Sequence, residues 1–492
     1  MLKPRNLLFY LGTLLLFGSG IYSIISYGSH LQTAPAPAAA SASPGTTAAV
    51  PEGHALPAKA SGQGGVLQGL VDNLKQPLCL LLLQVIVIVA AARTLGALFH
   101  RIGQPPVIGE MIAGILLGPS LLGMIAPAVE SFVFPATSMG PLKILSQIGV
   151  ILFMFVVGIE LDVQHLRTKA HAAVMVSHAS IIVPFFLGSA FSLLIYKSLA
   201  GTGTHFSAFA LFMGVSMSIT AFPVLARIIE ERRMSGSFLG TTAIACAAVD
   251  DVTAWCLLAF IVAIVKANGL SGSVVTIALT LTFIAAMLFI VKPRVAALVE
   301  KRPHIRTGGP FLAAIFCFIF ASALFTEAIG IHALFGAFLA GVCMPQDAGL
   351  RTFLRERLEA FSSSFLLPLF FAFTGLRTQI GLLNDTTSWL ICLAVVAVAI
   401  AGKLGGSMVA ARWTGMSWGD SFSLGALMNT RGLVELIVLN LGYDLGILPP
   451  RIFAMMVLMA LVTTFMTGPL LGAVAWVRRR QTAGIGYGAT FS

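Results

Sequence analysis

Two neighbouring aspartates, Asp250 and Asp251, stand at the centre of an apolar run between Gly236 and Lys266. A carboxylate at the centre of a membrane helix costs about 2.5–3.5 kcal/mol on insertion scales, so a pair is not retained by chance. An interfacial position is the alternative, but about a dozen largely apolar residues flank the pair on each side. Adjacent helical residues point about 100° apart. We therefore expect one carboxylate to face a water-filled cavity and the other to face a partner on a neighbouring helix.

Few charged residues can neutralise these aspartates. Lys403 lies near the middle of a later apolar run, and Arg431 and Glu435 lie in the next run at a spacing of four residues, which allows them to pair with each other. The alternative for Lys403 is that it extends to the membrane surface, although its reach from mid-span is poor. If Arg431 offsets Glu435 and Lys403 offsets one aspartate, one aspartate remains for a transported cation or proton.

Two of the apolar runs contain residues that can interrupt a membrane helix. Residues 217–223 read Met-Ser-Ile-Thr-Ala-Phe-Pro, and residues 428–432 read Met-Asn-Thr-Arg-Gly. Proline or glycine beside hydroxyl and amide side chains allows a helix to break where its backbone lines a cavity. One such sequence is equally well explained by a kink. Two at matching positions of a repeat favour two crossed discontinuous helices at an ion site.

The elements that position these residues must be membrane helices. Of the 492 residues, 57% are hydrophobic and only 10% are charged, and the mean hydropathy is +0.94. Apolar runs of about 20 residues recur without the alternation that a barrel strand requires. The composition therefore predicts an all-α polytopic membrane protein and leaves no stretch for a soluble catalytic domain. We expect a transporter and not an enzyme.

The chain divides into four parts. Residues 1–28 form a signal anchor or a cleaved signal peptide, and a length of about 20 apolar residues favours the anchor. Residues 29–76 are a flexible Ala/Pro/Ser/Gly-rich linker, residues 77–478 are the transmembrane domain, and residues 479–492 are a short cytoplasmic tail. Thirteen spans are expected in the transmembrane domain, with centres near residues 86, 115, 151, 183, 215, 251, 281, 318, 338, 366, 400, 430 and 462.

Basic residues orient these spans. One set of alternate loops holds about 18 Lys and Arg residues and the other about 7, so the richer set, which includes the segment from Lys292 to Arg306 and the C-terminus, is expected in the cytoplasm of a cell. Lys3 and Arg5 place the N-terminus there too, if its helix is retained. Because these charges lie in short loops of a membrane protein, they do not predict nucleic-acid binding.

An internal repeat relates the two halves of the transmembrane domain. Residues 109–119 resemble residues 336–345, and residues 152–160 resemble residues 369–377. Both matches are seven spans apart. Since seven is odd, the two copies run through the membrane in opposite directions, which is the inverted-topology repeat of secondary transporters.

These motifs together resemble the second monovalent cation:proton antiporter family. The resemblance rests on Val249–Trp255, Thr220–Ala226, Gly114–Pro119 and Met428–Asn440, and the last is similar to the plant and fungal cation/H⁺ exchangers and their bacterial relatives. It implies thirteen helices, a mobile core domain, a dimerisation domain and elevator-type alternating access in a homodimer.

The resemblance also implies roles for individual residues. Asp251 matches the ion-binding carboxylate, and Asp250 matches the aspartate that pairs with a core lysine, here Lys403. Ser218 and Thr220 match the hydroxyl residues of the broken helix.

The sequence thus predicts an antiporter that exchanges Na⁺ or K⁺ for protons. One carboxylate holds either a proton or a dehydrated cation, so competition at Asp251 couples the two fluxes. The alternative is a proton- or ligand-gated cation channel. An intramembrane aspartyl protease needs carboxylates from two facing helices, whereas Asp250 and Asp251 are neighbours on one. No cofactor is expected, because the six cysteines lie in apolar runs without metal-binding spacing.

Overall fold

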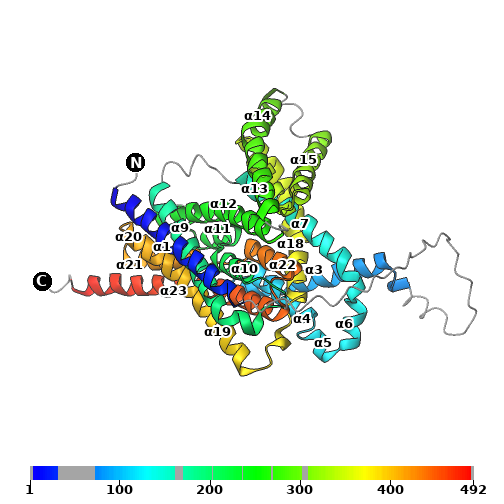
Figure 1. Ribbon diagram of the computed structural model, residues 1–492, viewed down its shortest axis with the longest axis horizontal. Coiled ribbons are helices and arrows are strands. Elements are labelled where there is room, and N and C mark those ends of the chain that lie inside the picture. The colour runs from blue at the N-terminus through cyan, green and yellow to red at the C-terminus, as the bar shows by residue number, and fades with distance from the viewer. Residues whose placement is uncertain are drawn as a thin grey trace, which may run out of the picture.

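A computed structural model describes residues 4–31, 73–160, 170–201, 203–234, 237–266, 270–301 and 308–488 (Figure 1). All the regular secondary structure within these ranges is helical. The predicted linker lies almost wholly outside them. The helices form two bundles that touch at few places, chiefly where α23 (Pro450–Gly488) meets η5 (Ile380–Leu382) and α4 (Pro106–Leu117), and where α18 (Leu367–Leu376) meets α22 (Leu433–Asp444).

The first bundle, here called the site bundle, contains the aspartate helix. Its helix α9 packs against α10 and α12, and the interrupted helix α10–α11 packs against α12 and α22. The helix that carries Lys403 is continuous from α19 to α20 through a π-helical turn, η6. The members of the site bundle are α9 (Ala170–Leu199), α10 (Phe206–Ser218), α11 (Phe222–Glu231), α12 (Phe238–Lys266), α19 (Thr386–Ile400), η6 (Ala401–Gly405), α20 (Gly406–Trp413), α21 (Trp418–Met428), α22 (Leu433–Asp444) and α23 (Pro450–Gly488).

The second bundle, here called the glycine bundle, is built on close helix contacts at glycines. Its strongest packing joins α7 to α16, α3 to α4 and α18 to α4. Its members are α3 (Pro77–Arg101), α4 (Pro106–Leu117), α5 (Leu122–Ile125), α6 (Pro127–Val133), η1 (Ala136–Ser138), α7 (Met139–Glu160), α15 (Gly309–Ala328), α16 (Ala333–Val342), α17 (Ala348–Phe361), η4 (Ser362–Leu366), α18 (Leu367–Leu376) and η5 (Ile380–Leu382).

Glycines of the sequence repeat meet each other across the glycine bundle. A Cβ on Gly114 of α4 would overlap the backbone of α18, and one on Gly375 of α18 would overlap the backbone of α4. Gly158 of α7 and Gly341 of α16 stand in the same relation. The first helix of each repeat therefore packs on the second helix of the other. A pseudo-two-fold axis between inverted repeats requires this exchange of partners.

The expected count of thirteen spans is not confirmed. Among the described residues, eleven helices are long and apolar enough to cross a membrane, or twelve if α21 and α22, which are bent by 44° at their break, form one span. Helix α16, at the ninth expected centre, has only ten residues. Such a helix rises about 15 Å, half the hydrocarbon thickness of about 30 Å. Hydropathy alone does not separate such a helix from a membrane span, because α16 is buried between α7 and α15 and is apolar for contact with protein and not with lipid.

Three further helices lie at the margins of the bundles. Helix α1 (Pro4–Ser29) packs against α9 and α10, with the ring of Phe17 in edge contact with Phe186 at 5.1 Å. Helix α13 (Leu270–Ala285) continues through the π-helical turn η2 (Ala286–Val291) into α14 (Lys292–Lys301). With α15 these helices project from the rest of the molecule at the top of Figure 1. At the C-terminus, α23 extends through most of the predicted tail.

Candidate ion-binding site

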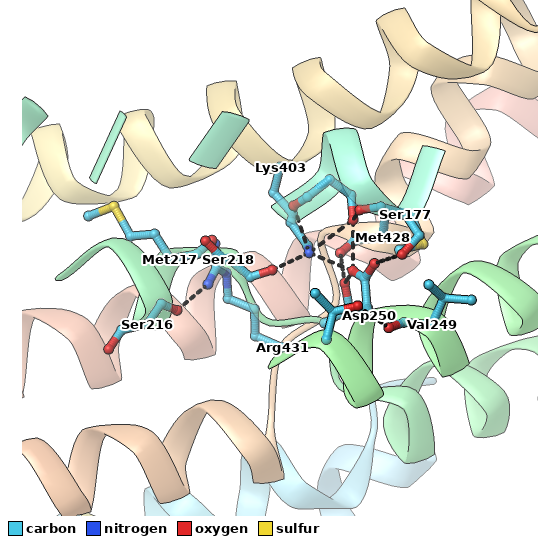
Figure 2. Close-up of polar contacts among 12 residues, drawn as sticks. Ser177, Ser216, Met217, Ser218, Val249, Asp250, Lys403, Met428 and Arg431 are labelled. Atoms are coloured by element: carbon cyan, nitrogen blue, oxygen red, sulfur yellow. Dashed lines mark hydrogen bonds and ion pairs between the residues drawn. The ribbon is translucent and has the colours of Figure 1, made fainter. Parts of the chain in front are cut away.

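Asp250 is fully buried near the middle of α12 and receives hydrogen bonds on both carboxylate oxygens (Figure 2). Ser177 Oγ of α9 donates to Oδ1 at 2.5 Å. Ser180 Oγ and Thr220 Oγ1 donate to Oδ2, each at 2.7 Å. Lys403 Nζ lies 2.8 Å from the same oxygen. Four donors from two other helical segments and one break therefore converge on this carboxylate.

Lys403 reaches this aspartate from the π-helical turn η6. Glycines surround it, and a Cβ on Gly402 would lie 2.7 Å from Cα of Pro184, so the glycine lets η6 approach α9 closely. The ammonium group donates to the carbonyl of Ser180 at 2.9 Å and to the carbonyl of Ser218. An ammonium has three protons to donate. Asp250 and two backbone carbonyls are enough to satisfy them.

The two interrupted helices meet at their breaks. Helix α10 ends at Ser218 and α11 begins at Phe222, while α21 ends at Met428 and α22 begins at Leu433. The amide of Ala221 in the first break donates to the carbonyl of Thr430 in the second at 3.0 Å. Thr220 Oγ1 also lies 3.1 Å from the carbonyl of Met428. The chain therefore satisfies part of its interrupted backbone by pairing one break with the other.

Arg431 in the second break is the other fully buried cation of the site bundle within the described residues. Its guanidinium donates to the carbonyls of Ser216 at 2.9 Å and Met217 at 2.7 Å (Figure 2). It also lies 3.2 Å from Oε1 of Glu435. The Arg431 backbone is tied to α23 through Thr464, whose hydroxyl donates to its carbonyl at 2.8 Å. Arg431 and Glu435 thus form the expected contact at a spacing of four residues.

Asp251 differs from every other buried charge of the site bundle. Its side chain is 1% exposed, and neither carboxylate oxygen has a hydrogen-bond partner among the described residues. A buried carboxylate without donors is costly unless a proton or a cation neutralises it. Asp251 is therefore the candidate ion-binding side chain of this bundle.

The remaining predicted hydroxyl residues lie near the cluster but do not contact Asp251. Ser218 Oγ donates to the carbonyl of Gly214 in its own helix at 2.7 Å, and the part of Ser218 that enters the cluster is its carbonyl. Thr220 binds Asp250 as described above. Within the described residues, no group of three or more His, Cys, Asp or Glu side chains is placed to hold a resident metal ion.

Three polar residues that the structure brings to notice are not singled out by the sequence patterns described above. Ser177 and Ser180 bind Asp250. A serine in a membrane helix usually donates to a backbone carbonyl of its own helix, so the presence of a serine does not by itself indicate a functional site. Their spacing of three residues, which places both on one face of α9, was the available clue. Glu110, buried in α4 of the glycine bundle, is a charge in an apolar run and was visible from composition alone.

The chain is similar to several known transport proteins. A family model described as "Sodium/hydrogen exchanger, transmembrane" matches residues 86–477. The Na(+)/H(+) antiporter NhaS4 of Synechocystis sp. is 45% identical over 398 residues, which cover 80% of this chain and 97% of that protein. The K(+)/H(+) antiporter 1 of Saccharomyces cerevisiae is 34% identical over 419 residues. This chain spans 48% of the yeast protein, and the match covers 83% of this chain.

A solved structure shares the fold. The sodium proton antiporter MjNhaP1 from Methanocaldococcus jannaschii superimposes with a TM-score of 0.57 at 13% sequence identity, covering 82% of this chain and 98% of that one. At this identity the likeness concerns the fold alone.

Proposed function

Because this chain belongs to the sodium/hydrogen exchanger family, we propose that it exchanges a monovalent cation, Na⁺ or K⁺, for protons across a membrane. Its relatives are antiporters and not enzymes, and the similar proteins include one named for Na⁺/H⁺ exchange and one named for K⁺/H⁺ exchange. Both cations therefore remain substrates to be tested.

The observation that carries the proposal is the contrast between Asp251 and its surroundings. Asp250 and Glu435 each have a cation within ion-pair distance, at 2.8 and 3.2 Å, whereas Asp251 has no hydrogen-bond partner among the described residues. A proton and a dehydrated cation compete for such a carboxylate, since binding of one removes the charge that attracts the other. Competition at Asp251 thus couples the two fluxes without a further gate.

Alternating access in this proposal is of the elevator type. The site bundle moves as a body relative to the glycine bundle and carries Asp251 between the two membrane faces. Support comes from the sparse contacts between the bundles. One of these is an ion-pair group in which Asp444 of α22 lies 2.8 Å from Lys143 of α7 and 2.6 Å from Arg377 after α18. Partly exposed pairs of this kind break at little cost, so they permit sliding.

The proposal includes a cellular setting. The protein is a homodimer in the cell membrane, and the loops rich in Lys and Arg, together with the C-terminus, face the cytoplasm. Helix α1 is retained as an anchor, which places the N-terminus on the same side. Its packing on α9 and α10 favours retention over cleavage, because a signal peptide has no need of a matched surface.

Exchange by the purified protein in liposomes tests the proposed function. With a pH-sensitive dye inside, external Na⁺, K⁺ or Li⁺ added separately should drive proton movement in the opposite direction for at least one of the first two. Asp251→Asn protein and protein-free liposomes serve as controls. Downhill cation flux without proton counter-movement would reject the antiporter and support the alternative, a cation channel.

A further inference from the structure

We infer that helix α1 is a permanent part of the moving bundle, packed on α9 and α10 throughout alternating access and displaced with them relative to the glycine bundle. The inference rests on the elevator movement of the proposed function. It gives the N-terminal helix, which that proposal uses as an anchor, a place in transport.

One face of α1 is shaped for contact with α9 and α10. Its buried and half-buried residues recur at spacings of three and four, which is the stripe of a helix packed on protein. This stripe includes Phe17, Gly20, Ile21, Ile24, Gly28 and Leu31. The rest of the helix surface carries Leu15, Leu16 and Tyr22, which are 73%, 69% and 76% exposed, so it suits contact with lipid.

Two glycines of this stripe fit against aromatic rings. A Cβ on Gly28 would lie 1.9 Å from the ring of Phe206, the first residue of α10. One on Gly20 would lie 2.6 Å from the ring of Phe186 in α9. Phe206 is fully buried and its ring is in edge contact with that of Tyr196 at 5.1 Å, so it has little room to move. The glycines therefore permit a close approach of α1 to both helices.

These contacts also fix the direction of α1. Gly20 meets α9 near its middle, whereas Gly28 meets the beginning of α10, which follows the end of α9 in the chain. Helix α1 therefore runs in the same direction as α9. The Lys and Arg residues that precede both helices in the sequence predict this direction as well, from the cytoplasm outward.

The connections of α1 to the two bundles differ in stiffness. It is packed on α9 and α10, which also carry Ser177, Ser180 and Ser218 of the candidate site. Residues 32–72 join it to the glycine bundle, and a chain of about 40 residues can span at most roughly 140 Å. Such a connection does not restrain a displacement of several ångströms, whereas close packing does. Helix α1 is thus expected to follow α9 and α10.

Cross-linking in liposomes tests the inference. In a variant that keeps exchange after replacement of its six native cysteines, Gly20→Cys and Phe186→Cys are joined by a short bifunctional thiol reagent. This link ties α1 to α9, so exchange should continue at the rate of the same variant before linking. A protease site inserted within residues 32–72 reports how complete the link is, because cleaved but linked protein migrates as one band.

The matched control links the two bundles to each other. It joins Lys143→Cys of α7 to Asp444→Cys of α22, whose parent side chains lie 2.8 Å apart. This link should reduce exchange to the level of protein-free liposomes. Loss of exchange on linking α1 to α9 would overturn the inference. Continued exchange after linking α7 to α22 would instead reject the elevator movement.

Distances between spin labels give a second test that does not depend on activity. Ser23→Cys of α1, Leu194→Cys of α9 and Leu324→Cys of α15 place labels at exposed positions. Labelled protein is diluted with unlabelled protein and measured in pairs, at low pH and at high pH with Na⁺ or K⁺. The distance between positions 23 and 194 should stay constant, while their distances to position 324 change together.

Two results of this measurement would contradict the inference or its premise. If position 194 moves relative to position 324 and position 23 does not, α1 stays with the glycine bundle and the inference is wrong. If the distance between positions 194 and 324 is the same under all conditions, the elevator movement itself is rejected.

Glycine substitutions test the packed surface. Gly28→Ala should displace α1 from Phe206 and lower the melting temperature of the protein by a few degrees. The matched control is Gly18→Ala on the same helix, where a Cβ meets no atom within 4 Å, and it should leave the melting temperature unchanged or slightly raised. Equal effects of the two substitutions would show that α1 is not held at Gly28, which would overturn the inference.

Discussion

Lys403 and Arg431 lie in two regions of one bundle that are alike in construction. Each is fully buried and each contacts one carboxylate. In the last turn of α10, Lys403 donates to one carbonyl and Arg431 to two. The regions differ in the carboxylates. Asp250 receives three hydroxyl donors in addition to Lys403, whereas Oε2 of Glu435 has no donor among the described residues. Asp251 follows Asp250 directly, and no second carboxylate accompanies Glu435 within α22 except Asp444 at its far end.

This difference separates two uses of buried charge. The region of Arg431 closes the broken backbone of two half-helices, and its charges sum to zero without an ion. The region of Lys403 does the same for α10 but leaves one carboxylate in excess. In the proposed function the paired charges hold the interrupted helices and the unpaired one binds the transported ion, a division that the following substitutions test.

The largest effect is expected from Asp251→Asn. The amide keeps the shape of the side chain but can neither take up a proton nor neutralise a cation, so exchange should fall to the level of protein-free liposomes. Because the unpaired charge is removed, the folded protein should be at least as stable as the parent in a thermal unfolding assay. Exchange near the parent rate in this variant would contradict the site assignment.

A large effect on stability is expected from Lys403→Ala. Removal of one partner of a buried pair typically costs about 3–5 kcal/mol, since the remaining charge has no compensation. Here Ser177, Ser180 and Thr220 still bind Asp250 but supply no positive charge. The double variant Lys403→Ala with Asp250→Asn should recover much of the lost melting temperature. Simple addition of the two single losses in this double-mutant cycle would mean that the pair contributes no coupling.

A smaller effect is expected from Glu435→Gln. Arg431 retains the carbonyls of Ser216 and Met217 and loses only the charge of its partner, so we expect a loss of about 1–3 kcal/mol in stability. Cation-driven proton movement should persist with an unchanged coupling ratio, because Glu435 lies outside the excess-charge region. Loss of exchange in a protein that remains folded would show that both regions take part in transport.

The smallest perturbation tests which side of the membrane each end of the site bundle faces, through cysteines in two loops on opposite predicted sides. Glu300→Cys at the end of α14 and Leu382→Cys in η5 place exposed thiols at loops of opposite predicted sides. An impermeant thiol reagent applied to intact cells should label the cysteine at position 382 and leave the one at position 300 unlabelled, relative to the parent protein with its six native cysteines. Labelling of position 300 from outside would reverse the orientation and the assignment of the cytoplasmic face.

The sequence predicted the charged residues of the site better than their polar neighbours. Asp250, Asp251, Lys403, Arg431 and Glu435 stand out because a charge in an apolar run is costly and therefore informative. Ser177 and Ser180 do not stand out, since a hydroxyl can satisfy itself on its own helix, as Ser218 does.

The fold shows the same division between strong and weak signals. Hydropathy located the helices because each span needs about 20 apolar residues. It failed at α16, whose apolar side chains face protein instead of lipid. The π-helical turn that carries Lys403 could not be predicted from the sequence, in which only its glycines are unusual. Its geometry depends on how closely α9 approaches.

The reciprocal glycine contacts of the glycine bundle set the order in which the protein can be completed during synthesis. Helix α4 ends at Leu117 and its partner α18 begins at Leu367, about 250 residues later. At synthesis rates of about 5–20 residues per second, synthesis of the intervening residues takes roughly 12–50 s, and the glycine surface of α4 stays uncovered for that time. The surface of α7 around Gly158 waits in the same way for α16. Until the second repeat emerges from the ribosome, the glycine surfaces of the first repeat lack the helices that cover them in the folded protein.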